Sequence, residues 1–373
     1  MPLPKCPPGF TDHIFKRVHG LPLPLRYWPP RASSTSTSPS PDVPSRVTNG
    51  TAQPNGASPA RDTPWLLWVH GGGYTCGKWA HPTPWLLPAF SEYGLVSVGY
   101  RLQPEASLAE MAQDVVDAYH YARTSMGLGD RCVIGGASAG TTVAALAALE
   151  LIRRERKATG EGVGAPRAFL SVYGLLDSLA YLEQERNQGP QPEPSYLVST
   201  DEQLAEIYAD PDPAQASVQN PWDTELPPHV PLQEIRDHLG LPGYEPSDTE
   251  LRRVDVYSYA ACHGNLFESV CRMKDYHSDS EFKDRVRADS PQHILQKEGE
   301  FMPTFLMHGL ADDIVPASHS ENFARTLRSK GVPTEEVYVE GAGHVYDFGF
   351  EKAGDAGWDV SVVPALRFLD RHV

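Results

Sequence analysis

Short apolar runs alternate with amphipathic segments along most of the chain beyond residue 64. These runs lie at 65–69, 95–100, 131–135, 168–173, 301–308 and 335–340. Between them, residues 108–123 have the 3.6-residue spacing of a helix, and the alanine-rich residues 139–154 predict a second one. Continuous apolar strands separated by helices are typical of a parallel sheet that helices cover on both faces. The pattern therefore predicts an α/β fold.

The first 64 residues follow a different pattern. Residues 13–28 alternate apolar and polar side chains around Gly20, which predicts two short antiparallel strands that form an edge hairpin. Residues 31–63 are rich in proline, serine and threonine and lack both periodicities. Because this segment is too polar to bury itself, we expect a flexible surface loop.

A long interval separates the fourth apolar run from the fifth. Residues 178–285 are too many for a connection inside a compact domain, so they predict an inserted lid, proline-rich at first and helical over 252–273. We expect four parts in the chain. They are an N-terminal arm at 1–64, the first part of the core at 65–177, the lid at 178–285 and the second part of the core at 286–373.

Charge and composition exclude several classes of protein. The 373 residues include 48 acidic and 32 basic ones, a formal net charge of −16, so we expect no nucleic-acid partner. No apolar stretch approaches the roughly 18 residues of a membrane helix, and we expect no stable membrane insertion. The proline-containing N-terminus lacks the apolar core of a signal peptide, and the five cysteines are scattered. These features predict a cytoplasmic protein without a disulfide framework or a metal site.

Residues 136–140 read G-A-S-A-G and lie between a predicted strand and a predicted helix. Glycines on both sides of Ser138 permit a strained turn that lifts the serine oxygen clear of the sheet, and a helix N-terminus favours developing negative charge. Ser138 is therefore a candidate nucleophile. A serine that only caps the helix would fit the same five residues, so this motif alone leaves both interpretations open.

The sequence H-G-G-G at 70–73 directly follows the predicted strand at 65–69. Three successive glycines expose backbone N–H groups that no side chain blocks, and such groups can donate hydrogen bonds to the oxyanion of a tetrahedral intermediate. A tight turn is the alternative interpretation of this motif in isolation. The two motifs in this order on successive strands favour an oxyanion-binding loop.

A serine nucleophile needs a base, and the base needs a carboxylate that orients it. Asp312 lies in the sequence HGLADDIVP at the end of a predicted strand, where such an acid belongs. His344 ends the sequence GAGH after the last predicted strand, among small residues that let it approach the serine. The chain order Ser138, Asp312, His344 is the order that a strand–turn–helix nucleophile of this kind uses.

Other reactive residues are less favoured by their positions. His308 precedes the acid in its motif, which favours a structural role, and Asp313 stays open as an alternative acid. Tyr74 and Trp79 follow the glycine loop and are candidates for the wall of an acyl pocket, with plain packing as the alternative. The sequence places no base beside Cys76, so we do not expect it to be a nucleophile.

Four motifs together give the chain a family resemblance. They are HGGG at 70–73, YRLQPE at 100–105, G-x-S-x-G at 136–140 and HGxxDxxVP at 308–316. With them the chain resembles the α/β-hydrolases of the hormone-sensitive-lipase type, and it is similar to the kynurenine formamidase and prolyl-oligopeptidase-like branches. The resemblance covers about 65–177 and 301–350. It implies an α/β-hydrolase fold, with a mainly parallel sheet flanked by helices. The resemblance does not extend to the inserted lid, which the length of the interval at 178–285 predicts.

The resemblance implies the same nucleophile, acid and base as the residues themselves. It also implies an oxyanion hole built from the backbone N–H groups of Gly72, Gly73 and Ala139. Two positions depart from the family elbow GDSAGG, since Ala137 replaces the aspartate and Thr141 the last glycine. These departures put the hydrogen bonds around the elbow, and with them the substrate preference, in question.

The expected function is a serine hydrolase that cleaves a carboxylic ester of a small or medium apolar acyl substrate through an acyl-enzyme, without a cofactor or metal. One alternative is an acyltransferase or cyclase of specialised metabolism that uses the same triad. Another is a non-catalytic ligand-binding homologue. The expected partner is a small-molecule ester or acyl substrate, and a homodimer is left open.

Overall fold

The computed structural model describes residues 8–31, 62–77, 79–80, 82–158, 163–190, 205, 208–209, 211–218, 260, 262–264 and 266–373. The predicted surface loop at 31–63, apart from its two ends, lies outside these residues. So does the first part of the helix predicted over 252–273.

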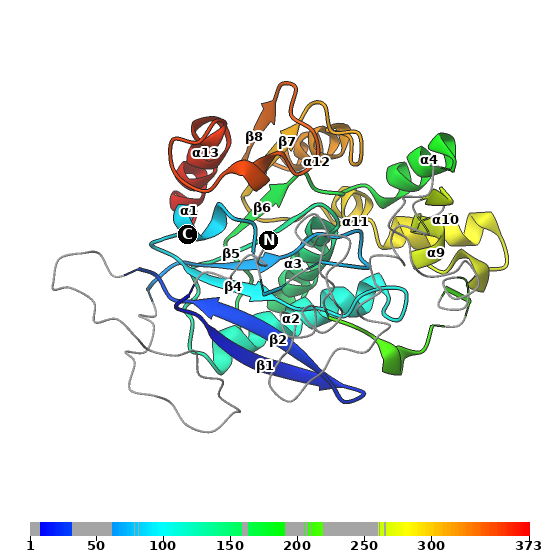
Figure 1. Cartoon of the computed structure of the whole chain (residues 1–373), viewed down its shortest axis with the longest axis horizontal. Coiled ribbons are helices and arrows are strands. Elements are labelled where there is room, and N and C mark those ends of the chain that lie inside the picture. Colours follow the sequence, from blue (N-terminus) through cyan, green and yellow to red (C-terminus); the bar gives the residue numbers. More distant parts are fainter. Residues whose placement is uncertain are drawn as a thin grey trace, which may run out of the picture.

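An eight-stranded sheet forms the centre of the molecule, with the order β1-β2-β4-β3-β5-β6-β7-β8 (Figure 1). The strands are β1 (Thr11–Val18), β2 (Leu21–Trp28), β3 (Trp65–Val69), β4 (Gly94–Val98), β5 (Cys132–Ala137), β6 (Ala168–Val172), β7 (Thr304–Gly309) and β8 (Thr334–Val339). β2 is antiparallel to both of its neighbours, and all other pairs are parallel. The predicted α/β class with a mainly parallel sheet is confirmed.

The β1–β2 hairpin turns at His19 and Gly20, whose φ angles of 49° and 87° are both left-handed. Two such residues form the tight turn whose twist matches that of the flanking strands. Val18 pairs with Leu21 beside the turn, and the hairpin occupies one edge of the sheet (Figure 1).

Helices cover both faces of the sheet. They are α1 (Leu86–Ala89), α2 (Leu108–Thr124), α3 (Ala139–Lys157), α4 (Ser178–Gln188), α9 (Leu266–Val270), α10 (Asp279–Ala288), α11 (Pro291–Glu298), α12 (Ser318–Ser329) and α13 (Trp358–Asp370). α2 begins with a capping box, in which the Ser107 hydroxyl accepts from the Glu110 N–H and the Glu110 carboxylate accepts from the Ser107 N–H. Among the described residues, no helix combines the length and apolar character needed to cross a bilayer.

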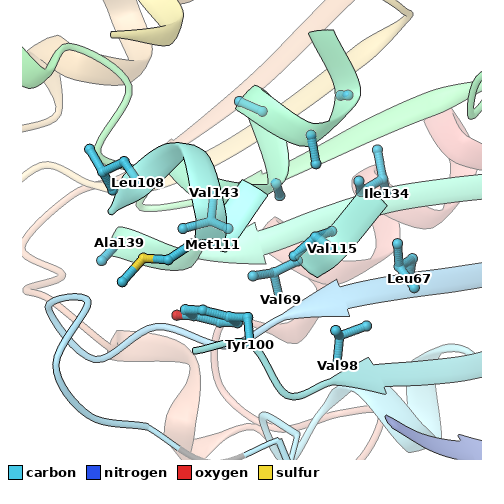
Figure 2. Close-up of a cluster of buried hydrophobic side chains, with 14 of the residues drawn as sticks. Leu67, Val69, Val98, Tyr100, Leu108, Met111, Val115, Ile134, Ala139 and Val143 are labelled. Atoms are coloured by element: carbon cyan, nitrogen blue, oxygen red, sulfur yellow. The ribbon is translucent and has the colours of Figure 1, made fainter. Parts of the chain in front are cut away.

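Two layers of apolar side chains hold the helices to the sheet, because successive strand residues point to opposite faces. Leu67 and Val69 join the layer under α2, α3 and α12, which Figure 2 shows around Val143 of α3. Leu66 and Trp68 join the other layer, under α1 and α13. Burial on both faces explains why the strands are continuous apolar runs in the sequence.

The parallel strands bring four loops to one edge of the sheet. The loops after β3, β5, β7 and β8 contain residues 70–73, 138, 310–316 and 340–345, respectively. In open α/β sheets, ligands bind outside the carboxyl ends of the strands. α4, α9 and α10 gather at one side of the molecule, next to α11 (Figure 1).

Candidate active site

Ser138 lies at the sharp turn from β5 into α3. Its backbone has φ 52° and ψ −129°, a left-handed φ that is uncommon for a residue with a side chain. The turn is held by its own backbone, since the Ser138 N–H donates to the Val172 carbonyl at 3.0 Å and the Ser138 carbonyl accepts from the N–H of Thr141 at 3.0 Å. Strain that the surrounding structure maintains is typical of a nucleophile elbow.

The two glycines of the elbow are required by close backbone contacts. A Cβ on Gly136 would lie 2.7 Å from the carbonyl carbon of Gly140. A Cβ on Gly140 would lie 2.2 Å from the carbonyl oxygen of His70. The strand, the helix and the glycine loop therefore approach one another as closely as backbones can, which fixes the position of Ser138.

Thr141, one of the two departures from the family elbow, ties the turn together. Its hydroxyl donates to the Gly136 carbonyl at 2.7 Å, and its side chain is fully buried. Gly174 makes room for it, because a Cβ there would lie 2.4 Å from the threonine methyl group. Ala137, the other departure, is buried and lines the cavity beside Ser138. The elbow thus gains a hydrogen bond that a glycine could not make.

The structure brings Ser138, His344 and Asp312 into one chain of hydrogen bonds. His344 Nε2 lies 3.0 Å from Ser138 Oγ, and His344 Nδ1 lies 2.7 Å from Asp312 Oδ2. A carboxylate can only accept, so Nδ1 carries the proton and Nε2 is free to accept the serine proton. The other carboxylate oxygen of Asp312 accepts from the N–H groups of Ile314 and Val315 at 3.0 and 2.9 Å.

Asp312 has a second histidine as neighbour. His308 Nε2 lies 3.2 Å from Asp312 Oδ2 and 2.8 Å from the Val315 carbonyl, and His308 Nδ1 lies 2.7 Å from Ser320 Oγ. Burial alone would raise the pKa of Asp312, but the hydrogen bonds from His308 and His344 hold it well below its usual range. Asp313, the alternative acid, is exposed. His308 is thus a fully buried neighbour of Asp312, in keeping with the structural role expected for it.

The glycine loop forms part of the cavity wall with residues that carry no side chain. Gly72 has φ 118°, and a Cβ there would lie 2.2 Å from the Cys76 carbonyl oxygen. The Gly72 carbonyl accepts from the N–H groups of Thr75 and Cys76, which holds the turn of the loop. Gly72, Gly73 and Ala139 all line the cavity that contains Ser138.

His70 is a packing residue of this loop. Its ring stacks on Tyr100 with centroids 4.5 Å apart, and the Tyr100 hydroxyl donates to the His70 carbonyl at 2.8 Å. Burial lowers the pKa of His70 to about 4, so the imidazole is neutral at neutral pH. A neutral ring adds no charge beside the glycine loop.

The cavity beside Ser138 has a volume of about 330 Å³ and an aromatic wall. Six aromatic residues from the described ranges line it: Trp68, Tyr74, Tyr173, Tyr181, Phe267 and Phe348. Tyr74 was expected there from the sequence, whereas Trp79 is buried but is not among the lining residues. Ile314, Val345 and Phe348 line the cavity and are also exposed, so its opening is apolar.

Two segments of the predicted lid region contribute to the wall. Tyr181 comes from α4, and Leu266 and Phe267 come from α9. Glu185 of α4 accepts from the Phe267 N–H at 2.8 Å, and Arg186 pairs with Glu268 at 2.5 Å. Burial raises the pKa of Glu185 to about 7. The contact between α4 and α9 therefore sets the position of Phe267. No sequence motif predicts this contact.

Metal-ligand geometry is absent from the described part of the chain, in which no group of three His, Cys, Asp or Glu side chains could hold a metal ion.

Comparisons with known proteins agree with the fold. Residues 66–232 match a family model described as the alpha/beta hydrolase fold, and residues 254–370 match the prolyl oligopeptidase family. Among solved structures, carboxyl esterase 2 from Tuber melanosporum superposes with a TM-score of 0.54 at 14% identity, over 98% of this chain and 89% of that one. Esterase 2 of Thermogutta terrifontis, phosphorylated by paraoxon, superposes with a TM-score of 0.53 at 17% identity, over 99% and 95%.

The curated relatives that the chain matches are much longer proteins. The chain is 28% identical to the non-reducing polyketide synthase adrD of Penicillium rubens over 83% of its length, but it covers 12% of that synthase. It is 26% identical to the 5-methylorsellinic acid synthase of Aspergillus terreus over 85% of its length, again 12% of the relative. The chain thus spans about an eighth of the relatives' length. From its sheet and these matches, the chain has the α/β-hydrolase fold, and it resembles the hormone-sensitive-lipase-type and prolyl-oligopeptidase branches.

Proposed function

We propose that the protein is a serine hydrolase that cleaves a carboxylic ester through an acyl-enzyme on Ser138. One observation carries the proposal: the Ser138 hydroxyl, at a strained elbow, is 3.0 Å from His344 Nε2, and His344 is 2.7 Å from Asp312 on its other side. A capping serine needs neither the histidine nor the acid. The esterase fold of the solved structures supports the same conclusion.

In the first half of the reaction Ser138 Oγ attacks the carbonyl carbon of the ester. His344 Nε2 takes the serine proton, and Asp312 stabilises the imidazolium that results. The carbonyl oxygen becomes an oxyanion, for which the backbone N–H groups of Gly72, Gly73 and Ala139 are the donors at hand. The intermediate collapses when His344 returns the proton to the leaving alcohol, which leaves the acyl group on Ser138.

In the second half a water molecule attacks the acyl-enzyme. His344 accepts a proton from this water, the oxyanion forms again in the same loop, and collapse returns the proton to Ser138 Oγ. The products are the carboxylic acid and the free enzyme. Every proton in the cycle thus passes through Nε2 of His344, which the hydrogen bond to Asp312 keeps in the required tautomer.

The cavity suggests an uncharged acyl group of small or medium size. The described residues that line it include no Asp, Glu, Lys or Arg, and its volume of about 330 Å³ lies near the lower end of ligand cavities. Its aromatic wall favours a flat or apolar group. Two relatives of the chain are named as polyketide synthases and a third as a 5-methylorsellinic acid synthase. We therefore propose an acyl group of polyketide type as the group that the cavity binds.

A panel of p-nitrophenyl esters from acetate to dodecanoate, with the benzoate included, tests this proposal. We expect kcat/KM to be highest for the medium-length or aromatic acyl groups and to fall for dodecanoate, because the long chain exceeds the cavity. Measurement is by release of nitrophenolate. Equal turnover of all esters would contradict the assignment of the cavity as the acyl site.

A second candidate function is acyl transfer or cyclisation with the same triad. The similarity to polyketide synthases over 82–85% of the chain favours it, because those proteins are named as synthases and not as hydrolases. If an alcohol acceptor at saturating concentration captures the acyl group, chromatography of the products will show a new ester and a matching decrease in acid. Acid as the sole product at every acceptor concentration would exclude transfer to that acceptor.

A further inference from the structure

A second carboxylate is buried beside the candidate histidine. Asp347 follows His344 by three residues, on the 3₁₀ turn η4 (Tyr346–Gly349), and it has no exposed surface. Asp347 Oδ2 accepts from the indole N–H of Trp85 at 2.6 Å. Its other oxygen, Oδ1, makes no hydrogen bond of full geometry within the described part of the chain, and Tyr173 is a weak partner of the carboxylate. A buried carboxylate with so few hydrogen bonds is costly, so this one calls for an explanation.

Tyr173 connects this carboxylate to His344. Its ring packs on the imidazole with centroids 4.8 Å apart, and its buried hydroxyl is a weak hydrogen-bond partner of the Asp347 carboxylate. Burial raises the pKa of the Tyr173 hydroxyl well above its usual value, and the neighbouring charge of Asp347 adds to that effect. The tyrosine thus lies between the carboxylate and the imidazole.

The backbone holds Tyr173 in this position. Its φ of 36° is left-handed, which is unfavourable for a bulky side chain, and its N–H donates to the Met307 carbonyl at 2.8 Å. The preceding residue, Val172, accepts from the N–H of Ser138. A strained backbone at this point directs the ring to the histidine, next to the elbow that carries the serine.

We propose that Asp347 is a second carboxylate for His344, a positioning residue that stabilises the imidazolium across Tyr173 while Asp312 holds the ring directly. This role rests on the proposed function of the triad. The groups that face His344 are Ser138 at the elbow, Asp312 after β7, Tyr173 after β6 and Asp347 on its own loop. Those that face Asp347 are Trp85, Tyr173, His344 and the adjacent Tyr346.

The ionisation of Asp347 makes the folded protein less stable as the pH rises. Burial raises the pKa of Asp347 to about 6, although the Trp85 hydrogen bond opposes the shift. The folded state therefore holds the proton more tightly than the unfolded state, and the stability that the protonated acid contributes is lost as the pH rises from about 4 to about 6. Asparagine has nearly the same shape and no charge, so it does not lose stability as the pH rises. Above pH 6, an Asp347→Asn variant should be at least as stable as the wild type.

The decisive measurement is the titration of His344 by NMR in protein labelled with ¹⁵N-histidine, with a His344→Asn variant for the assignment. We expect Asp347→Asn to weaken proton binding by His344 about tenfold, because a charge in a buried environment is lost. This readout does not depend on the substrate. In ester hydrolysis, kcat at pH 8 should fall about tenfold with little change in KM, and the thermal midpoint should be equal or higher.

Asp359, an exposed aspartate in the first turn of α13, supplies the matched control. Solvent screens its charge, so Asp359→Asn should leave the titration of His344 unchanged. A destabilised Asp347→Asn variant with an unshifted His344 titration would assign Asp347 a structural role and overturn the proposal. A stable variant with an unshifted titration would overturn it as well. A shifted titration in a protein that hydrolyses no ester would refute the proposed function and leave the coupling intact.

Discussion

Ser138→Ala is expected to reduce kcat for ester hydrolysis on the order of a millionfold, the loss that removal of a triad nucleophile can produce. The serine oxygen forms the bond to the acyl group, and no other hydroxyl lies within hydrogen-bond distance of His344 Nε2 among the described residues. Alanine fits the strained elbow about as well as serine, so the fold should persist. Steady-state kinetics and the thermal midpoint of the purified variant check both statements.

A buried serine elsewhere in the same sheet supplies the control for this experiment. Ser97 of β4 is fully buried and is not among the residues that line the cavity. Ser97→Ala should keep kcat within about twofold of the wild type, since small changes away from functional features have small effects. Residual turnover by Ser138→Ala near the wild-type rate would mean that the reaction does not pass through Ser138.

Asp312→Asn is expected to lower kcat about ten-thousandfold, while Asp313→Asn leaves it nearly unchanged. An asparagine can donate to His344 Nδ1, and this stabilises the tautomer whose Nε2 carries a proton and cannot accept the serine proton. The variant also loses the charge that stabilises the imidazolium. Asp313 is the matched control, because it is the next residue of the same loop and is exposed. The pair thus separates the acid from its neighbour in one assay of kcat and KM.

The opposite ranking of the two variants would contradict the geometry of the site. If Asp313→Asn lost more activity than Asp312→Asn, the loop would have to rearrange in solution so that Asp313 reaches His344. Equal and small losses in both variants would mean that the histidine needs no carboxylate for its reaction.

The sheet could be predicted from the sequence because strands that are buried on both faces are continuous apolar runs. β3 coincides with the apolar run at 65–69, and the other core strands begin or end within a few residues of their predicted bounds. The order of the motifs on parallel strands was also enough to predict that Ser138, Asp312 and His344 lie at one edge of the sheet. Glycine spacing anticipated the elbow, where Gly140 tolerates no Cβ against His70.

Contacts between distant segments could not be predicted, because no pattern in the sequence marks them. The hydrogen bond from Trp85 to Asp347 joins residues separated by 262 positions, and neither residue belongs to a motif. The contact of Glu185 with Phe267 is of the same kind. The hydrogen bond of Thr141 across the elbow is one that the glycine of the family pattern could not make, and the sequence showed only that this glycine was missing. Such details depend on which side chains the fold brings together.

The central claim is that Ser138 becomes covalently acylated, and labelling with a fluorophosphonate tests it most directly. The probe transfers its phosphonyl group to an activated serine oxygen and releases fluoride. Intact-mass spectrometry should show one adduct per chain, peptide mapping should place it on Ser138, and Ser138→Ala should remain unmodified. A folded wild-type protein that stays unlabelled, or an adduct on any other residue, would contradict the account.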